Sequence, residues 1–137
     1  MQIQPYVFFD GSCEQALQFY QQAVGAKVEM LMRYKENPEP PPPGRVPDGY
    51  GEKIMHSSVR IGDSVIMAAD DCTGGTKAHS GFSLSISGGD TAQARRTFDA
   101  LAAGGQVTVP MNKTFWSPAF GMLVDKFGVH WMVMAAH

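Results

Sequence analysis

The side chains best suited to metal binding or covalent chemistry in this sequence are its histidines and cysteines. They are His56, His79, His130, His137, Cys13 and Cys72. No two of them stand in the HxH, HExxH or CxxC spacing that brings ligands together on one element. Local motifs therefore predict no metal site, and a hydrogen-bonded structural role is the common alternative for a single histidine.

Cys13 is a candidate nucleophile because it opens a predicted helix. A thiol at a helix N-terminus has a lowered pKa, and we expect this one to be half exposed. The sequence supplies no base beside it, so a structural role is favoured. The N-terminus has no basic region followed by a long apolar stretch, so no export signal is predicted and Cys13 and Cys72 are interpreted as reduced thiols.

Composition limits the classes of function. The chain has 137 residues, a net charge of −2 and 18% charged residues, and its pI is about 6.0. This balance argues against a nucleic-acid partner, and the sequence has no apolar run of 18 residues that would span a membrane. We expect one cytoplasmic, globular domain of residues 1–137.

The first half of the chain predicts a strand, a helix and three further strands. Residues 3–9 read as a strand, residues 13–24 as a helix capped by Ser12 and stopped by Gly25, and residues 26–34 as a strand. Residues 35–53 hold six of the nine prolines and form a stiff surface loop. A disordered excursion, a pocket lid and a dimer arm are its open interpretations.

Residues 54–61 and 64–69 predict a hairpin around Gly62-Asp63, with a type I′ or II′ turn. A two-residue loop fixes the register, so Ser58 is paired with Met67 and His56 with Ala69. One face of the hairpin then carries polar side chains, and the more apolar face is expected beneath a helix.

The second half repeats this plan. Residues 81–87 read as a strand, a helix follows from residue 90 or 91 to about 103, and residues 106–111 form another strand. A loop at 114–118 leads to a hairpin of residues 120–124 and 129–134. The turn places Met122 opposite Met132 and Val124 opposite His130.

The two halves correspond at a constant offset of 79 residues, since Phe19, Gly25 and Val28 match Phe98, Gly104 and Val107. The sequence thus predicts an α+β fold of two βαβββ modules, residues 1–71 with the Pro-rich loop 35–53, and residues 79–137. Together they would form a curved eight-stranded mixed sheet with both helices outside and a cup inside.

Several stretches resemble one known group of proteins. They are Tyr6-Val7-Phe8-Phe9-Asp10-Gly11, Lys53-Ile54-Met55-His56, Ile61-Gly62-Asp63-Ser64, Lys113-Thr114-Phe115-Trp116 and Phe120-Gly121-Met122-Leu123-Val124-Asp125. With this repeat, the chain resembles the PhnB-like group of the vicinal oxygen chelate superfamily. That superfamily includes glyoxalase I, extradiol dioxygenases, fosfomycin-resistance enzymes and bleomycin-binding proteins, and the resemblance implies a homodimer.

The resemblance also locates where metal ligands would lie. The superfamily's four ligand positions fall near Pro5, Met67, Gly81 and Met132, and none of these is a histidine or a carboxylate. A hard divalent ion needs such donors. We therefore expect no metal and no cofactor, with an unconventional site around His56 or His130 as the alternative.

On this interpretation the cup binds a small molecule. Tyr6 and Phe8 are expected to pack under the first helix, and Arg33 and Arg60 either meet an anionic ligand or form surface salt bridges. The candidate ligand-binding residues are His56, Ser58, Met67, Ser83, Ser85, Phe115, Trp116, Met122, His130 and Met132. A collapsed core filled by methionines is the alternative to a ligand site.

Two functions remain open from the sequence. The first is metal-independent binding of a small molecule, and the second is a metal-dependent lyase, isomerase or transferase with an unconventional site. Similar proteins are often named demethylubiquinone methyltransferases, but a cofactor-binding glycine-rich turn should follow the first strand of a parallel sheet. The nearest string, Gly49-Tyr50-Gly51, lies in the Pro-rich loop, so a methyltransferase is not expected. No catalytic residue is assigned.

Overall fold

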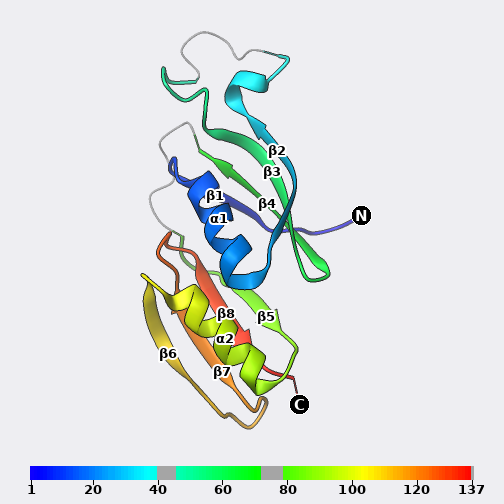
Figure 1. The fold of residues 1–137 in the computed structure, drawn as a ribbon, viewed down its shortest axis with the longest axis vertical. Helices are drawn as coiled ribbons and strands as arrows, with labels where there is room; N and C mark the ends of the chain where they lie inside the picture. Colours follow the sequence, from blue (N-terminus) through cyan, green and yellow to red (C-terminus); the bar gives the residue numbers. More distant parts are fainter. Residues whose placement is uncertain (40–45, 72–78, 137) are drawn as a thin grey trace. The chain divides into compact units, whose positions relative to one another are not determined.

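The computed structural model describes residues 1–39, 46–71 and 79–136. The chain divides into two compact units, Met1–Lys77 and Ala78–His137, called unit 1 and unit 2 below. Each unit consists of a four-stranded sheet with one helix against one of its faces (Figure 1). Neither helix is long and apolar enough to cross a membrane in the part of the chain described.

Unit 1 follows the predicted order of elements. Its elements are β1 (Tyr6–Phe9), α1 (Cys13–Val24), β2 (Lys27–Arg33), the 3-10 turn η1 (Tyr34–Glu36), β3 (Ile54–Ile61) and β4 (Ser64–Asp70). The strands lie in the order β1-β4-β3-β2. β1 is parallel to β4, whereas the other pairs are antiparallel. β1 and β2 are thus the edge strands.

Unit 2 repeats this topology. Its elements are β5 (Leu84–Ser87), α2 (Thr91–Ala102), β6 (Gln106–Asn112), β7 (Phe120–Val124) and β8 (His130–Met134). The strand order β5-β8-β7-β6 matches that of unit 1 strand for strand. The predicted α+β fold of two βαβββ modules is confirmed. Hydrogen bonds join the described strands into two sheets of four, not into the expected single ladder of eight.

The helix ends show which local predictions were right. Gly25 takes the left-handed conformation after α1, with φ 67°, as a helix stop requires. Ser12 precedes α1 but its hydroxyl caps nothing; instead the Cys13 amide donates to Asp70 Oδ1 at 2.9 Å. The cap of α1 is therefore supplied from β4, 57 residues away. This partner could not be found by local reasoning.

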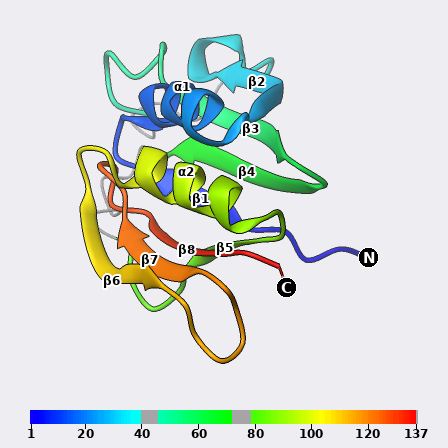
Figure 2. The ribbon, with the colours of Figure 1, turned by 60° about the horizontal axis from the view of Figure 1, so that its bottom comes forward.

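Both predicted hairpins form with the expected pairing. Ser58 lies opposite Met67, and Met122 lies opposite Met132. In the turn between β3 and β4, Gly62 has φ 59° and no non-glycine residue in the described chain has positive φ. Because a type I′ turn needs positive φ at both central residues, this turn is type II′. Figure 2 shows the β3–β4 hairpin and, in unit 2, the long connection from β6 to β7.

The face of β1 that meets α1 differs from the prediction. Val7 and Phe9 are buried, at 3% and 2% exposure, whereas Tyr6 and Phe8 are 37% and 45% exposed. The expectation that Tyr6 and Phe8 pack under the helix is therefore wrong. All four side chains are apolar or aromatic, so alternation alone could not decide which two face inward.

The core of unit 2 depends on close packing between α2 and its sheet. Trp131, Leu123 and Val133 are almost fully buried on the helix side. A Cβ at Gly121 would lie 2.6 Å from the Phe98 ring of α2. The bare backbone at this position is what allows Phe98 to approach β7 so closely.

Candidate ligand-binding face

We use the term open face of unit 1 for the side of its sheet opposite α1. Paired Cα positions run across all four strands, from Tyr6 to Met67, from Met67 to Ser58, and from Ser58 to Met30. His56 lies two residues from Ser58 on β3 and therefore points to the same side. The open face consists of Tyr6, Phe8, Met30, His56, Ser58 and Met67.

Tyr6 connects the aromatic and polar parts of the open face. Its hydroxyl lies 2.8 Å from His56 Nδ1. Its ring stacks on Phe8, with centroids 4.7 Å apart and planes 15° apart. Partial burial raises the pKa of the Tyr6 phenol above its ordinary value, with a smaller contribution from Cys13. Tyr6 therefore remains a hydrogen-bond donor at neutral pH.

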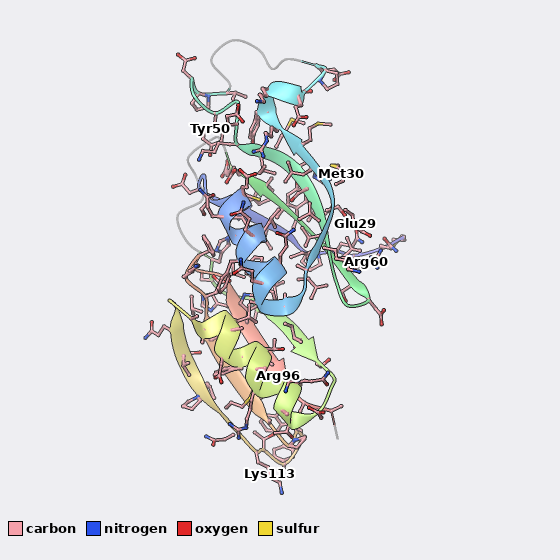
Figure 3. All side chains as sticks on the ribbon, in the orientation of Figure 1. Glu29, Met30, Tyr50, Arg60, Arg96 and Lys113 are labelled. Atoms are coloured by element: carbon pink, nitrogen blue, oxygen red, sulfur yellow. The ribbon has the colours of Figure 1, made fainter. Side chains whose placement is uncertain are left out.

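Charged side chains lie next to the open face, near the β3–β4 turn. Arg60 Nε donates to Glu29 Oε2 at 2.9 Å, and Lys27 is paired in register with Arg60. Figure 3 shows Glu29, Met30 and Arg60 along β2 and β3. Arg60 thus has the salt-bridge role that was the alternative to binding an anion.

Arg33 also forms a salt bridge. Its guanidinium donates to both carboxylate oxygens of Glu14, at 3.2 and 2.5 Å, and to the Glu52 carbonyl at 2.7 Å. The hydrogen bond from Arg33 lowers the pKa of Glu14 below its ordinary value. The bidentate contact fixes α1 to the end of β2.

Two tyrosines fix the described ends of the Pro-rich loop. The Tyr34 hydroxyl donates to the Asp70 carbonyl at 2.8 Å, and the Tyr50 hydroxyl donates to the Asp71 carbonyl at 3.1 Å. Their rings meet edge to face at 5.5 Å. Both ends of the loop are thereby attached to the end of β4. The proline run of residues 40–43 lies outside the described residues, so its conformation stays a prediction.

Unit 2 has a corresponding open face, opposite α2. Ser85 and Met122 are both paired with Met132, and Val124 is paired with His130. This face therefore combines methionines with hydroxyl and imidazole groups. Ser83 directly precedes β5 and is half-buried.

The loop after β6 carries two exposed aromatic side chains. Phe115 is 92% exposed and Trp116 47% exposed, and their rings meet edge to face at 4.7 Å. The Trp116 ring also lies 5.4 Å from Phe120 on β7. Trp116 is thus joined to the sheet of unit 2, whereas Phe115 extends into solvent.

Asp125 fixes the hairpin that presents Met122, His130 and Met132. Its Oδ1 accepts from the Phe127 and Val129 amides at 2.8 and 3.0 Å. Its Oδ2 accepts from Trp131 Nε1 at 2.9 Å, and the residue is buried. One carboxylate therefore closes the turn and also orients the largest core side chain of the unit.

The ten predicted ligand residues are divided between the two units. His56, Ser58 and Met67 share the open face of unit 1. Ser85, Met122, His130 and Met132 share that of unit 2, with Ser83 at the start of β5 and Phe115 and Trp116 in the loop. Tyr6, Phe8 and Met30 also lie on the open face of unit 1, although they were not among the ligand-binding residues predicted from the sequence. The parallel pairing of Tyr6 with Met67 places Tyr6 and Phe8 on this face, and the pairing of Met30 with Ser58 places Met30 there; both pairings exist only in the folded sheet.

The side chains at the superfamily's four metal-ligand positions, which the resemblance located in this sequence, do not suit a metal ion. In the described residues, no three His, Cys, Asp or Glu side chains come together where they could hold a metal ion. Of the four superfamily positions, Met67 and Met132 lie on the open faces, while the Pro5 carbonyl accepts from the Met67 amide at 2.9 Å. We therefore derive no chemistry through a metal. His137 lies outside the described residues.

Cys13 does not have the environment expected of a nucleophile. The side chain is fully buried instead of half exposed. Burial raises the pKa of its thiol to about 12, and the Asp70 carboxylate adds to the rise. The thiol is therefore protonated at neutral pH, which makes it unreactive. Cys13 is a free thiol, as predicted, and Cys72 lies outside the described residues.

Comparison with known proteins supports the predicted family. The family model described as 3-demethylubiquinone-9 3-methyltransferase matches residues 1–134. Protein YjdN of Escherichia coli K12 is 36% identical over 141 residues, which cover 97% of this chain and 94% of YjdN. The crystal structure of protein PA1353 from Pseudomonas aeruginosa is 36% identical, with a TM-score of 0.87 and coverage of 99% of this chain and 98% of the other.

More distant structures share the fold. A Bacillus cereus PhnB protein, titled as a putative 3-demethylubiquinone-9 3-methyltransferase, is 23% identical with a TM-score of 0.77, covering 99% of this chain and 100% of its own. A glyoxylase/bleomycin resistance protein/dioxygenase domain from Frankia sp. EAN1pec is 14% identical with a TM-score of 0.71, covering 100% and 98%. The chain belongs to the family whose model is described as 3-demethylubiquinone-9 3-methyltransferase, and it shares its fold with the PhnB protein and the glyoxylase/bleomycin resistance protein/dioxygenase domain.

Proposed function

We propose that this protein binds a small, partly apolar molecule on the open faces of its sheets without using a metal ion. The observation that carries the proposal is the open face of unit 1, where the hydrogen-bonded Tyr6–His56 pair adjoins the exposed Phe8 ring and Met67. Exposed aromatic and thioether groups bind apolar ligand surface, and a few polar groups orient the ligand.

The open face of unit 2 supports the same proposal, because Met122 and Met132 lie beside Ser85 and His130 there. We propose that the two modules form one domain and that the protein works as a cytoplasmic homodimer. The ligand-binding set is then the ten residues predicted from the sequence together with Tyr6, Phe8 and Met30.

The string Gly49-Tyr50-Gly51 gives no support to the methyltransferase description of the family. Gly49-Tyr50-Gly51 lies between η1 and β3, where a turn leads into an antiparallel strand. A nucleotide-type cofactor binds where a glycine-rich turn joins a parallel strand to a helix. Small-molecule binding is therefore the function that the geometry supports best.

The test begins with protein purified without chelator. Native mass spectrometry should detect a bound small molecule, and elemental analysis should find zinc, nickel, manganese and iron well below one equivalent. Met67→Gln, which places an amide at the centre of the open face, should weaken ligand retention by about tenfold. Val107→Gln changes an exposed apolar side chain on β6 and is the control. One equivalent of metal, lost together with the ligand in His56→Ala, would overturn the proposal.

A further inference from the structure

We infer that the Tyr6–His56 pair makes the open face of unit 1 selective for a flat apolar ligand that carries a neutral oxygen acceptor, of the ketone or amide carbonyl class. The inference deepens the proposed function and rests on it. It follows from three features of the face: the hydrogen bond between Tyr6 and His56, the distribution of charge, and the stacked rings.

The first feature is the hydrogen bond between the Tyr6 hydroxyl and His56 Nδ1, 2.8 Å long. A phenol is a better donor than acceptor, and a neutral imidazole has one nitrogen with a free lone pair. When Tyr6 donates to Nδ1, the imidazole proton resides on Nε2, because the partner of one ring nitrogen fixes the state of the other. In the described part of unit 1, Nε2 has no protein partner. His56 therefore offers an N–H donor, and a ligand atom that meets it must be an acceptor.

The second feature is the distribution of charge. Arg60 is neutralised by Glu29 at 2.9 Å, and Lys27 lies beside them near the turn. His56 is four residues away from Arg60 along β3, which is about 13 Å at the rise of a strand. In the described part of unit 1, Arg33, which follows the Met32 paired with His56, is likewise already bound to Glu14. A carboxylate at Nε2 would therefore leave water without a free arginine to meet it, which is costly, whereas a carbonyl oxygen needs only the hydrogen bond. A neutral acceptor is thus favoured over an anionic one.

The third feature is the aromatic pair. The Tyr6 and Phe8 rings are nearly parallel, with centroids 4.7 Å apart, and both are substantially exposed. Offset stacking against such a surface favours a flat ring. Met67 lies beside Tyr6 on β4, and Met30 lies on β2 at the opposite edge of the sheet; both thioethers can adapt to the ligand's outline. The acceptor and the flat group would then lie on one molecule, because Tyr6 touches both His56 and Phe8.

Four probes of similar size test the inference: acetophenone, ethylbenzene, benzoate and benzylammonium. Each is titrated into the ¹⁵N-labelled full chain, and dissociation constants are read from amide shifts on β1, β3 and β4. Acetophenone should bind about 3- to 10-fold more tightly than each of the other three, the range that one hydrogen bond supplies. The ¹⁵N shifts of the His56 ring should show Nδ1 without a proton in the neutral form.

Two variants isolate the polar pair from the apolar surface. Tyr6→Phe/His56→Phe keeps two rings and removes both polar groups, so the preference for acetophenone over ethylbenzene should disappear while ethylbenzene still binds. Tyr50→Phe removes a hydroxyl that is hydrogen-bonded elsewhere in the same unit and should keep the preference.

The possible outcomes separate the two proposals. If ethylbenzene binds this face but acetophenone binds no better, or if the neutral His56 ring carries its proton on Nδ1, the inference is wrong and the proposed function stands. If benzoate binds most tightly, the assignment of a neutral acceptor is wrong. If none of the four probes shifts these amides at its solubility limit, both proposals are overturned.

Discussion

Asp125→Asn should destabilise the protein, and the structure allows the magnitude to be worked out. The carboxylate accepts hydrogen bonds from the Phe127 and Val129 amides on Oδ1 and from Trp131 Nε1 on Oδ2. Asparagine can keep its oxygen toward the two amides. Its NH₂ group then faces the indole N–H, so that two donors meet in a buried site.

The cost has two parts. A hydrogen bond to a charged group contributes about 1.5–3 kcal/mol, and a buried donor left without an acceptor costs about 1–3 kcal/mol; these figures overlap and do not simply add. We expect the free energy of unfolding to fall by about 2–4 kcal/mol, a large share of the roughly 5–15 kcal/mol typical of a domain.

Urea unfolding followed by tryptophan fluorescence and by circular dichroism measures this loss. Asp99→Asn makes the same chemical change on the exposed surface of α2 and should stay within about 0.5 kcal/mol of the unmodified protein. The Trp131 indole proton should also exchange with solvent faster in Asp125→Asn, because its acceptor is gone.

A double-mutant cycle isolates the indole contact. Trp131→Phe removes the N–H, so the penalty of Asp125→Asn should shrink in that background, with a coupling energy of about 1–3 kcal/mol. A coupling below about 0.5 kcal/mol, or an unchanged indole exchange rate, would refute the idea that this hydrogen bond holds the β7–β8 hairpin.

Two further predictions concern Gly105, where a side chain would clash with the backbone, and Cys13, whose thiol is buried. Gly105→Ala should lower the free energy of unfolding in urea by about 1–3 kcal/mol, because its Cβ would lie 2.2 Å from the Val124 carbonyl oxygen. Gly51→Ala is the control, since its Cβ would meet only an ordinary contact at 3.5 Å. Equal losses in the two variants would contradict the argument. In a Cys72→Ser variant, native Cys13 should resist a thiol reagent at pH 8 and react only after unfolding. The pKa of Cys13 is raised from 9.0 to about 12 on folding, so the contribution of Cys13 to stability is complete below about pH 9 and is lost as the pH rises toward 12. Cys13→Ala should flatten the plot of unfolding free energy against pH in this range. An unchanged slope would contradict the raised thiol pKa.

Short-range features of the chain could be predicted from the sequence alone. Gly25 ends α1 where the pattern placed its stop, and Gly62 sets the turn that pairs Ser58 with Met67. Such features depend on backbone dihedral angles and on side-chain alternation, which neighbouring residues decide. The presence of His56, Ser58 and Met67 on one face of the hairpin follows from the same register.

The tertiary structure decided which side of β1 joins that face. Tyr6 and Phe8 alternate with Val7 and Phe9, and both phases are apolar enough to be buried. Only parallel pairing with β4, more than 50 residues later in the chain, turned Tyr6 toward His56. Because Tyr6 and Phe8 face this side of β1, and Val7 and Phe9 the other, the candidate site has an aromatic surface and the Tyr6–His56 hydrogen bond.

The same distinction explains Cys13 and the cap of α1. The sequence placed the Cys13 thiol at the helix N-terminus, where a lowered pKa was expected. It could not show that the Asp70 carboxylate on β4 would accept a hydrogen bond from the Cys13 amide, or that the Cys13 side chain would be fully buried. Burial and a nearby carboxylate both raise a thiol pKa, and together they outweigh the helix N-terminus. The sequence therefore determined the order of the elements, the helix ends and the hairpin registers, because these depend on neighbouring residues, whereas β1 and β5 begin at Tyr6 and Leu84, three residues later than predicted. Which side chains meet across the sheet, and hence the chemistry of the open face, was decided by long-range pairing that no local pattern encodes.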